Sequence, residues 1–331
     1  GLRIAISTGD YNGIGPEVIL KTLQETDLSE VTPVITGSAG VIRFYSELLN
    51  IGLPFHSIDS AKKIEEGTVN VLESYGKKEY RVNPGELSRK AGKLSMKAVE
   101  RAIKLCRKEK ADAMVTAPIS KEAIQKAGYK VPGHTEFLAD KTSTSDYIMM
   151  MVSGELRIGL ATIHVPLAKV PSLLNEATVL RYLRIMHRSL QHDFGIPDPK
   201  IAVLGLNPHA GDGGVIGNEE IRYIAPALQK ARFNDMEVSG PFAADGFFGS
   251  GRYKSFDGIL AMYHDQGLIP FKTLSFGAGV NFTAGLPIIR TSPDHGTAFD
   301  IAGKNRADPR SFRHAFDLAR TLAQHRKKEP A

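Results

Sequence analysis

Hydrophobic and polar positions follow two periods along this chain. Short apolar runs bounded by turn residues predict buried strands, namely Leu2–Ser7, Val31–Thr36, Ala113–Thr116, Ile148–Val152, Gly159–Ile163, Ile201–Leu206 and Gly258–Tyr263. Apolar residues three or four positions apart predict helices, over Val18–Leu23, Gly40–Asn50, Ser88–Lys110, Leu173–Phe194 and Glu219–Ala231, with one more carrying Phe137 and Leu138. Residues 59–83 fit neither period and are expected to form a mobile or hairpin-bearing surface region. The alternation predicts an α/β fold with a largely parallel sheet, in which the two strands around residue 155 form an antiparallel pair.

Length and composition narrow the class of protein. The 331 residues, 42% hydrophobic and 24% charged, are typical of a globular protein of roughly two domains. No apolar run approaches the ~20 residues of a membrane span, and the N-terminus reads as a first strand instead of a secretory signal. Cys106 is the only cysteine, so no disulfide forms within the chain and the expected location is the cytoplasm.

The net charge of +6 is modest. Part of it lies on one predicted helix, where five basic residues recur at helical spacing: Lys93, Lys97, Arg101, Lys104 and Lys108. This pattern favours a solvated helix face over a nucleic-acid-binding patch, because the stretch has few aromatic residues for stacking and no known binding module. An anionic small substrate fits the charge equally well.

The first strand ends in a glycine-containing loop, Thr8–Glu17, and Pro16 suits the first turn of the helix that follows. A loop of this kind between strand and helix is consistent with phosphate binding. Its spacing matches neither the dinucleotide fingerprint nor the Walker loop, so a turn that only seats the helix is an equal alternative.

Three histidines, His164, His209 and His264, each follow an apolar strand closely. Strand ends of a parallel sheet meet at one edge, so these imidazoles are candidates for a metal site with an open position. Such ligands favour zinc or another transition metal over magnesium. The alternative is that each histidine is only a satisfied polar residue. Asp245 and Asp265 are candidate further ligands, partners of the ligands or bases; for both, the alternative is a helix cap or a surface carboxylate.

A second set of residues carries donors for anions. Lys272, Asn281 and Arg290, with His134 and Thr135, would suit a substrate that bears phosphate and carboxylate groups. Taken singly, each is as well explained by a surface or structural role. The glycine-rich surroundings of Asn281 and Arg290 favour a role beyond solvent contact.

The motifs together resemble one family closely, the 4-hydroxythreonine-4-phosphate dehydrogenases (PdxA) of vitamin B6 biosynthesis. The resemblance runs almost the length of the chain, in the family's order, through Gly13–Glu17, Thr116–Ala123, Gly133–Ala139, His164–Leu167, Gly205–Gly214, Tyr263–Lys272 and Gly279–Lys304.

The resemblance implies a two-domain α/β/α fold like that of isocitrate and isopropylmalate dehydrogenases, with a cleft between the domains. We expect residues 1–125 with 275–331 in the first domain, and residues 126–274, with the metal ligands and dimer contacts, in the second. The chain would work as a homodimer that binds no membrane or nucleic acid. The three histidines would bind one divalent metal per site, zinc first and magnesium, manganese or cobalt otherwise, with His164 and His209 reaching His264 from the partner subunit.

The resemblance also implies the remaining site residues. His134, Thr135, Lys272, Asn281 and Arg290 would bind the substrate, and Asp245, Asp265 and Lys272 are the catalytic candidates. NAD or NADP would lie on the segment 294–303, through Asp294, His295, Gly296, Thr297 and Gly303, which explains the missing dinucleotide fingerprint; a structural role for His295 is the alternative.

The implied reaction oxidises the C3 hydroxyl of 4-phosphohydroxy-L-threonine to a 3-oxo acid, which loses carbon dioxide to give 3-amino-2-oxopropyl phosphate. The alternative within the family is a 4-phosphorylated sugar acid, erythronate or threonate 4-phosphate. Two other classes are weaker: a metal-dependent hydrolase or lyase without a nucleotide, and a nucleic-acid-binding protein. One departure from the family is visible, since Tyr11 and Asn12 stand where the family has proline and a small residue.

Overall fold

The computed structural model describes residues 1–328, and the chain folds into two compact α/β units. Unit 1 contains Gly1–Ser145 and Leu286–Gln324, and unit 2 contains Asp146–Gly285 and residues 325–328. The sequence-based division, at residues 125 and 275, differs from this one on both sides. Helix α5 (His134–Lys141) remains in unit 1, and strand β11 (Val280–Ala284) pairs with a strand of unit 2.

The sheet of unit 1 has the strand order β3-β4-β2-β1-β5-β12, and its strand pairs are parallel. The strands are β1 (Leu2–Ser7), β2 (Val31–Gly37), β3 (His56–Ile58), β4 (Asn70–Glu73), β5 (Ala113–Thr116) and β12 (Arg290–Pro293). The expectation of a surface region over residues 59–83 was wrong for Asn70–Leu72, which are buried in β4 between two neighbouring strands. The run there is too short to show a period.

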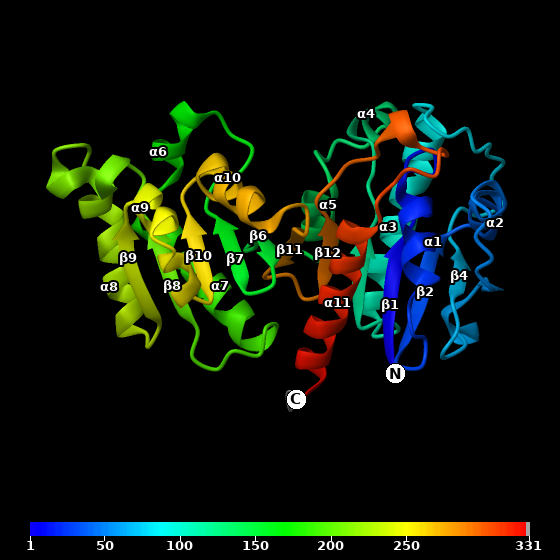
Figure 1. Ribbon diagram of the computed structural model, residues 1–331, viewed down its shortest axis with the longest axis horizontal. Coiled ribbons are helices and arrows are strands. Elements are labelled where there is room, and N and C mark those ends of the chain that lie inside the picture. Colours follow the sequence, from blue (N-terminus) through cyan, green and yellow to red (C-terminus); the bar gives the residue numbers. More distant parts are fainter. Residues whose placement is uncertain (329–331) are drawn as a thin grey trace. The chain divides into compact units, whose positions relative to one another are not determined.

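Helices cover this sheet (Figure 1). They are α1 (Gly15–Leu23), α2 (Ala39–Leu48), α3 (Arg89–Arg107), α4 (Lys121–Lys126), α5 and α11 (Arg310–Lys328), with short 3₁₀ turns at Ala61–Lys63 and Phe299–Ile301. The long helix α3 lies against β1 and β2, where Thr36 Oγ1 donates to the Ala98 carbonyl at 2.8 Å. Ser88 caps α3 by accepting from the Ala91 N–H, as expected of a serine at that position. The apolar face of α3 is buried, which matches the predicted amphipathic pattern.

The sheet of unit 2 has the order β11-β6-β7-β10-β8-β9. Its strands are β6 (Ile148–Ser153), β7 (Leu156–Leu160), β8 (Lys200–Leu204), β9 (Glu237–Phe242), β10 (Gly258–Ala261) and β11. The predicted antiparallel pair is confirmed as β6 and β7, and β11 also pairs with β6 in antiparallel orientation. From β7 onward the pairs are parallel, so the strands β7, β10 and β8 end at one edge of the sheet.

The helices of unit 2 are α6 (Val170–Leu173), α7 (Glu176–His192), α8 (Ala225–Phe233), α9 (Ala244–Gly249) and α10 (His264–Ser275), with short turns at Leu167–Lys169, Pro208–Gly214, Glu220–Ile224 and Arg252–Ser255. A Cβ on Gly159 would approach Met186 of α7 to 2.8 Å, whereas Ile158 and Leu160, its neighbours in β7, approach Gly267 of α10. Because successive residues of a strand point to opposite faces, α7 and α10 cover opposite faces of this sheet.

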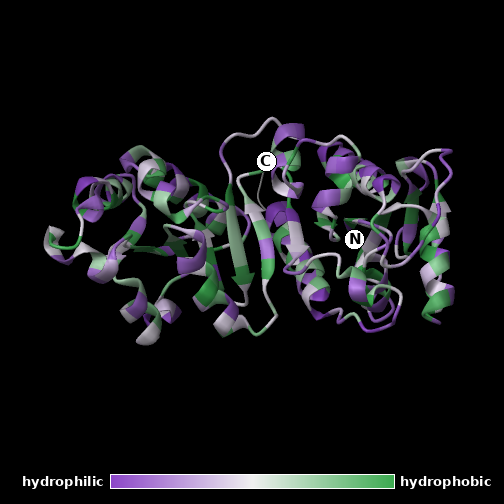
Figure 2. Cartoon of the chain, turned by 90° about the horizontal axis from the view of Figure 1, so that it is seen from above, coloured by the Kyte–Doolittle hydropathy of each residue, from purple (hydrophilic) through white to green (hydrophobic). Residues whose placement is uncertain are grey.

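Figure 2 shows hydrophobic residues gathered along the strands, while the helices mix both kinds. In unit 2 the core between the sheet and the helices α9 and α10 includes Met151, Leu204 and Phe271. No helix within residues 1–328 combines the length and the apolar character that a membrane crossing requires.

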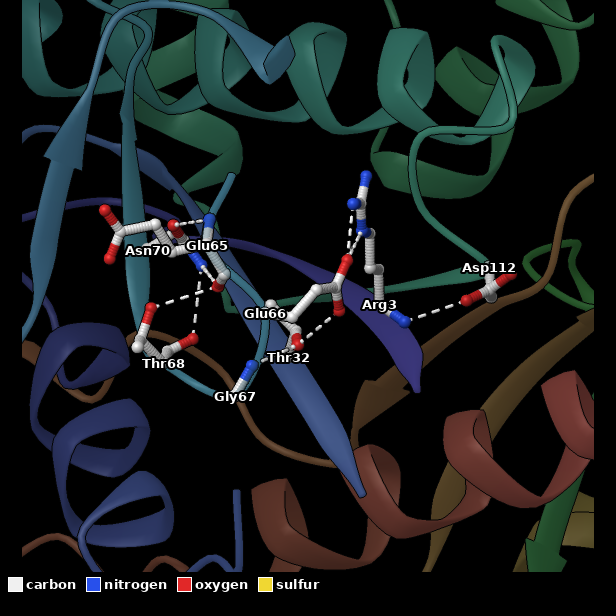
Figure 3. Close-up of polar contacts among 8 residues, drawn as sticks. All are labelled: Arg3, Thr32, Glu65, Glu66, Gly67, Thr68, Asn70 and Asp112. Atoms are coloured by element: carbon white, nitrogen blue, oxygen red, sulfur yellow. Dashed lines mark hydrogen bonds and ion pairs between the residues drawn. The ribbon is translucent and has the colours of Figure 1, made fainter. Parts of the chain in front are cut away.

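Polar side chains fix the strand starts of unit 1 (Figure 3). Asn70 is fully buried and orders the loop before β4, since its amide donates to the carbonyls of Glu65 and Thr68 and its Oδ1 accepts from the Glu65 N–H. On the next strands, Thr32 Oγ1 donates to Glu66, and the backbone N–H of Arg3 donates to Asp112.

Candidate active site

The loops that follow three neighbouring strands carry the three histidines. His164 lies just past β7, His264 is the first residue of α10 after β10, and His209 lies in the turn after β8. Since β7, β10 and β8 are adjacent and parallel, these loops leave the sheet at one edge, where ligand sites of open α/β sheets are found.

His164 and His264 lie side by side. Their ring centroids are 5.8 Å apart, and both line a pocket of about 370 Å³ together with Tyr263 and Asp265. Two imidazoles that share one zinc ion at Zn–N distances of about 2 Å place their ring centres roughly 5 Å apart. The pair therefore fits a divalent metal ion. The resemblance implied that His164 reaches His264 from the partner subunit, whereas here the two rings meet within one chain.

Asp265 orients one of these rings. Its Oδ1 lies 2.8 Å from Nδ1 of His264, so a neutral His264 that donates from Nδ1 presents Nε2 as a ligand atom. A carboxylate behind a histidine in this way fixes the tautomer and strengthens the ligand. This geometry suits the role of a partner behind the ligand, one of the alternatives for Asp265.

His209 lies in a backbone turn of rare conformation. The residues from His209 to Gly214 all have positive φ, and three of them, His209, Ala210 and Asp212, are not glycine. L-residues visit this left-handed region singly, at a cost of roughly 1–2 kcal/mol each. Within residues 1–328 no three His, Cys, Asp or Glu side chains are close enough to hold one metal ion, so His209 does not join the pair in this chain.

Glu220 holds this turn in place. Its side chain is buried, and Oε1 accepts from the backbone N–H groups of Leu206 and Asn207 at 3.0 and 2.7 Å. The Asn207 amide donates to Oε2 of Glu220 and to Glu219. Because strained backbone persists only where its surroundings fix it, the bonds of Glu220 to the residues just before His209 help to fix this turn.

Two further side chains tie the three loops together. Gln266 accepts from the Met262 N–H through Oε1 and donates to the Gly205 carbonyl through Nε2, both at 2.7 Å, so it joins the loop of His264 to that of His209. Thr162 Oγ1 donates to the Met262 carbonyl at 2.8 Å and joins the loop of His164 to the same point.

The other predicted residues of unit 2 lie on separate elements. Asp245 is exposed in the first turn of α9, and Lys272 is exposed on α10, about two turns after His264. Asn281 lies on β11, where its Nδ2 contacts Met149 Sδ at 3.5 Å and its buried Oδ1 has no hydrogen-bond partner.

Arg290 is the centre of a group in unit 1. The side chain is only 3% exposed, and its Nε and Nη2 both donate to Thr116 Oγ1, at 3.1 and 2.8 Å, while Nη1 reaches Thr135 Oγ1 at 3.5 Å. Desolvation lowers the pKa of the guanidinium to about 10, against the opposite effect of the charge on Glu136. A buried, charged fork held by neutral hydroxyls is a strong site for a carboxylate or phosphate.

His134 belongs to the same group. Desolvation and the charge of Arg290 hold the pKa of His134 well below its usual value, so the imidazole is neutral at physiological pH. Its Nε2 is buried and has no hydrogen-bond partner. A buried polar atom left in this state is costly unless a ligand or water satisfies it, so His134 points to a bound polar group beside Arg290.

The predicted nucleotide-binding segment, residues 294–303, is joined to the first loop. The Ile14 N–H donates to the Thr297 carbonyl at 2.9 Å, and a Cβ on Gly13 would lie 2.9 Å from the same oxygen. The Asp294 N–H donates to Ser311 Oγ at 3.0 Å. His295 has a buried Nε2 without a hydrogen-bond partner, and a Cβ on Gly296 would meet no other atom. A ring nitrogen of a bound base would suit His295 Nε2 as a hydrogen-bond partner. Gly303 has positive φ and lies against Pro84.

Sequence reasoning did not find Thr116, Thr162 and Glu220, and it gave Gln266 no role. Thr116 opens one of the segments that resemble the family but received no role there, and Thr162 carries no signal beyond its position near a strand end. Glu220 looks like an ordinary helix residue in the sequence, and only its burial distinguishes it.

Known proteins are similar to this chain over almost its entire length. The family model for the pyridoxal phosphate biosynthetic protein PdxA matches residues 29–319. The 4-hydroxythreonine-4-phosphate dehydrogenase of Prosthecochloris aestuarii is 49% identical, over 97% of this chain and 97% of that protein. The enzyme of the same name from Bacteroides thetaiotaomicron is 43% identical, over 100% of this chain and 91% of that protein.

Solved structures agree. The crystal structure of 4-hydroxythreonine-4-phosphate dehydrogenase from Klebsiella pneumoniae has a TM-score of 0.89 and 40% identity, covering 98% of each chain. A terephthalate 1,2-cis-dihydrodiol dehydrogenase from Burkholderia xenovorans has a TM-score of 0.70 and 32% identity, covering 97% of this chain and 98% of that one.

The fold, the clustered polar groups and these relatives define the class of protein: the chain is an α/β enzyme of the dehydrogenase type. It belongs to the PdxA family of vitamin B6 biosynthesis, the family expected from its motifs.

Proposed function

We propose that the protein oxidises the C3 hydroxyl of 4-phosphohydroxy-L-threonine with NAD or NADP, and that the 3-oxo acid formed loses carbon dioxide to give 3-amino-2-oxopropyl phosphate. The observation that carries this proposal is the buried guanidinium of Arg290 beside the unsatisfied Nε2 of His134. This pair is built to receive an anionic group with a hydrogen-bonding neighbour, as in a phosphorylated amino acid.

Two groups that the chain does not itself contain complete the chemistry. When bound, a divalent cation would supply a Lewis acid for the C3 hydroxyl, and a nicotinamide would supply the hydride acceptor. The rings of His164 and His264 would hold the cation, with His209 as the third ligand, and zinc suits three imidazoles best. The segment from Asp294 to Gly303 would hold the nucleotide.

The chain's own residues bind and orient the substrate. Arg290, with Thr135, holds one anionic end, and His134 completes the hydrogen bonds there from its neutral imidazole. Lys272 and Asn281 would bind the remaining polar groups, which fixes C3 in one place and lowers the entropic part of the barrier. Asp265 keeps His264 in one tautomer, and Asp245 is the candidate to accept the hydroxyl proton.

We propose that a second copy of the chain completes the metal site. Large apolar side chains are exposed on the segments that surround the histidines: Leu167 at 68% and Leu173 at 46%, Val215 at 82% and Ile221 at 56%, and Ile269 at 63%. Such exposed apolar surface is typical of an interface, and a symmetric dimer would use the same patch on both subunits. His209 of one subunit would then join the His164–His264 pair of the other.

The substrate could instead be a 4-phosphorylated erythronate or threonate, which offers Arg290 the same anion but lacks the hydroxy-threonine amino group. The reaction is expected in the cytoplasm, where the buried free thiol of Cys106 stays reduced.

The test is NADH formation from 4-phosphohydroxy-threonine and from 4-phospho-threonate, each with and without a chelator. We expect turnover of the first substrate, and loss of turnover on chelation. Turnover of 4-phospho-threonate alone would show that the phosphorylated sugar acid is the substrate. Activity that survives chelation would rule out the requirement for a metal ion. In the variant His209→Ala, metal content and NADH formation should fall together, whereas full turnover by that variant would exclude His209 as a ligand.

A further inference from the structure

The first loop of this chain holds a second segment against the predicted nucleotide-binding loop. Asn12, which is 1% exposed, makes three hydrogen bonds to the turn Asn83–Glu86. Its Oδ1 accepts from the Asn83 N–H at 2.8 Å, its Nδ2 donates to the Glu86 carbonyl at 3.0 Å, and its own carbonyl accepts from the Gly85 N–H at 2.7 Å. Asp10 fixes Asn12 in turn, by accepting from its N–H at 2.9 Å.

The turn has a defined geometry. The Glu86 N–H donates to the Asn83 carbonyl at 3.1 Å, and Gly85 has a φ of +86°. Proline followed by a glycine of positive φ is typical of a type II turn. The Asn12 side chain therefore binds a rigid turn at the first and last residues of that turn, Asn83 and Glu86.

The turn in its own right touches the nucleotide-binding loop at two points. A Cβ on Gly85 would lie 2.8 Å from the Phe299 carbonyl oxygen, and a Cβ on Gly303 would lie 2.8 Å from Pro84 Cβ. Both contacts are too close for either glycine to carry a side chain. A shift of the turn would consequently shift the loop from Phe299 to Gly303.

Tyr11 packs against the segment from Tyr75 to Tyr80, which leads into the Asn83–Glu86 turn. It is 1% exposed, and its ring packs against Tyr80 and Tyr75 with centroids 5.5 and 6.2 Å apart. The hydroxyl of Tyr45 donates to the Tyr11 carbonyl. Tyr11 and Asn12 are the residues that depart from the family pattern, and in this chain both face the segment from Tyr75 to Glu86.

We infer that Tyr11 and Asn12 are positioning residues, which fix the nucleotide-binding loop through the Asn83–Glu86 turn and so set the affinity for the nicotinamide dinucleotide. The inference rests on the proposed function, because it takes residues 294–303 as the cofactor site. Neither residue needs to touch the cofactor.

The variant Asn12→Ala tests this inference, and Asn70→Ala is its matched control. Asn70 is also a buried asparagine of unit 1, and its side chain makes three hydrogen bonds where that of Asn12 makes two, but the bonds of Asn70 order residues 65–68 (Figure 3). Removing hydrogen bonds of this kind changes an equilibrium by about tenfold. We expect Asn12→Ala to raise the KM for NAD about tenfold, with the KM for the phosphorylated substrate unchanged. Asn70→Ala should lower the Tm without changing either KM.

Hydrogen exchange separates the inference from the proposed function. In Asn12→Ala, amides of residues 83–86 and 297–304 should exchange faster together, whereas in Asn70→Ala only those near residues 65–70 should. An unchanged KM for NAD, equal effects of both variants, or unchanged exchange at 297–304 would overturn the inference. If the wild-type protein binds no dinucleotide while the exchange pattern is as expected, the cofactor assignment fails but the coupling of turn and loop stands.

Discussion

The Oε1 atom of Glu220 lies 2.7 Å from the backbone nitrogen of Asn207 and accepts its hydrogen bond. This contact sits at the entrance to the left-handed turn that carries His209. A buried carboxylate with several donors costs little only while all of them are present. The pair Glu220 and Asn207 thereby connects the stability of the fold to the geometry of a candidate metal ligand.

Glu220→Ala should destabilise the protein by about 3 kcal/mol, because two partly buried backbone N–H groups lose their acceptor and the Asn207 amide keeps only Glu219. Metal affinity should also fall by about tenfold or more, as for partners behind metal ligands. Chemical denaturation and calorimetric metal titration measure the two effects. The neighbouring variant Glu219→Ala removes only one acceptor and should cost less than about 1 kcal/mol. Equal effects of the two variants would contradict the anchoring role of Glu220.

Ala210→Gly should stabilise the fold, by about 1 kcal/mol, because Ala210 has a φ of +51° and glycine adopts this region without strain. Ala127 ends helix α4 with an ordinary φ of −80°, so Ala127→Gly should instead lower stability by a few tenths to about 1 kcal/mol. Thermal unfolding of both variants gives the signs. A loss of stability in Ala210→Gly would mean that the turn is not strained.

Thr116→Val should raise the KM for the phosphorylated substrate about tenfold, because Thr116 Oγ1 accepts from both Nε and Nη2 of Arg290 and sets the plane of the guanidinium. Thr291→Val is the control: it removes a hydrogen bond from Thr291 to the Ala315 carbonyl at 2.7 Å, elsewhere in the same unit. It should lower the Tm and leave the KM unchanged. Steady-state kinetics with saturating NAD decide the matter, and an unchanged KM in Thr116→Val would separate Arg290 from substrate binding.

The contribution of Asp10 to the free energy of unfolding should fall as the pH rises from about 4 through about 6. Desolvation raises the pKa of this fully buried carboxyl from 3.8 to about 6, although the hydrogen bond from the Asn12 N–H opposes the shift. A raised pKa means that the folded protein binds the proton more tightly than the unfolded chain. The contribution is therefore complete below pH 4 and lost above pH 6, a difference of about 3 kcal/mol.

The variant Asp10→Asn isolates this contribution. The difference in Tm between wild type and variant should favour the variant more at pH 8 than at pH 4, because asparagine has no proton to lose. Carboxylates such as Glu66, whose pKa is lowered by Thr32 and Arg3 against the effect of desolvation, are present in both proteins and cancel. A difference that does not vary with pH would show that Asp10 titrates normally.

The sequence by itself determined the elements and the family. Apolar runs and helical periods depend on neighbouring residues, so β1, α3 and the β6–β7 pair could be predicted from local patterns. The strand β4 could not, because its burial comes from its neighbours β2 and β3 and its own apolar run is short. The position of each histidine after a strand was visible for the same local reason.

Only the tertiary structure decided which side chains meet. Arg290 and Thr116 are 174 residues apart in the chain, and no local pattern pairs them; the same holds for Asn12 with Asn83 and for His164 with His264. The left-handed turn at His209 is another case, since Gly211 and Gly213 hint at it but His209, Ala210 and Asp212 avoid that conformation unless something holds them. The buried carboxylate of Glu220 does so. Its role depends on desolvation and distance, which exist only once the chain has folded.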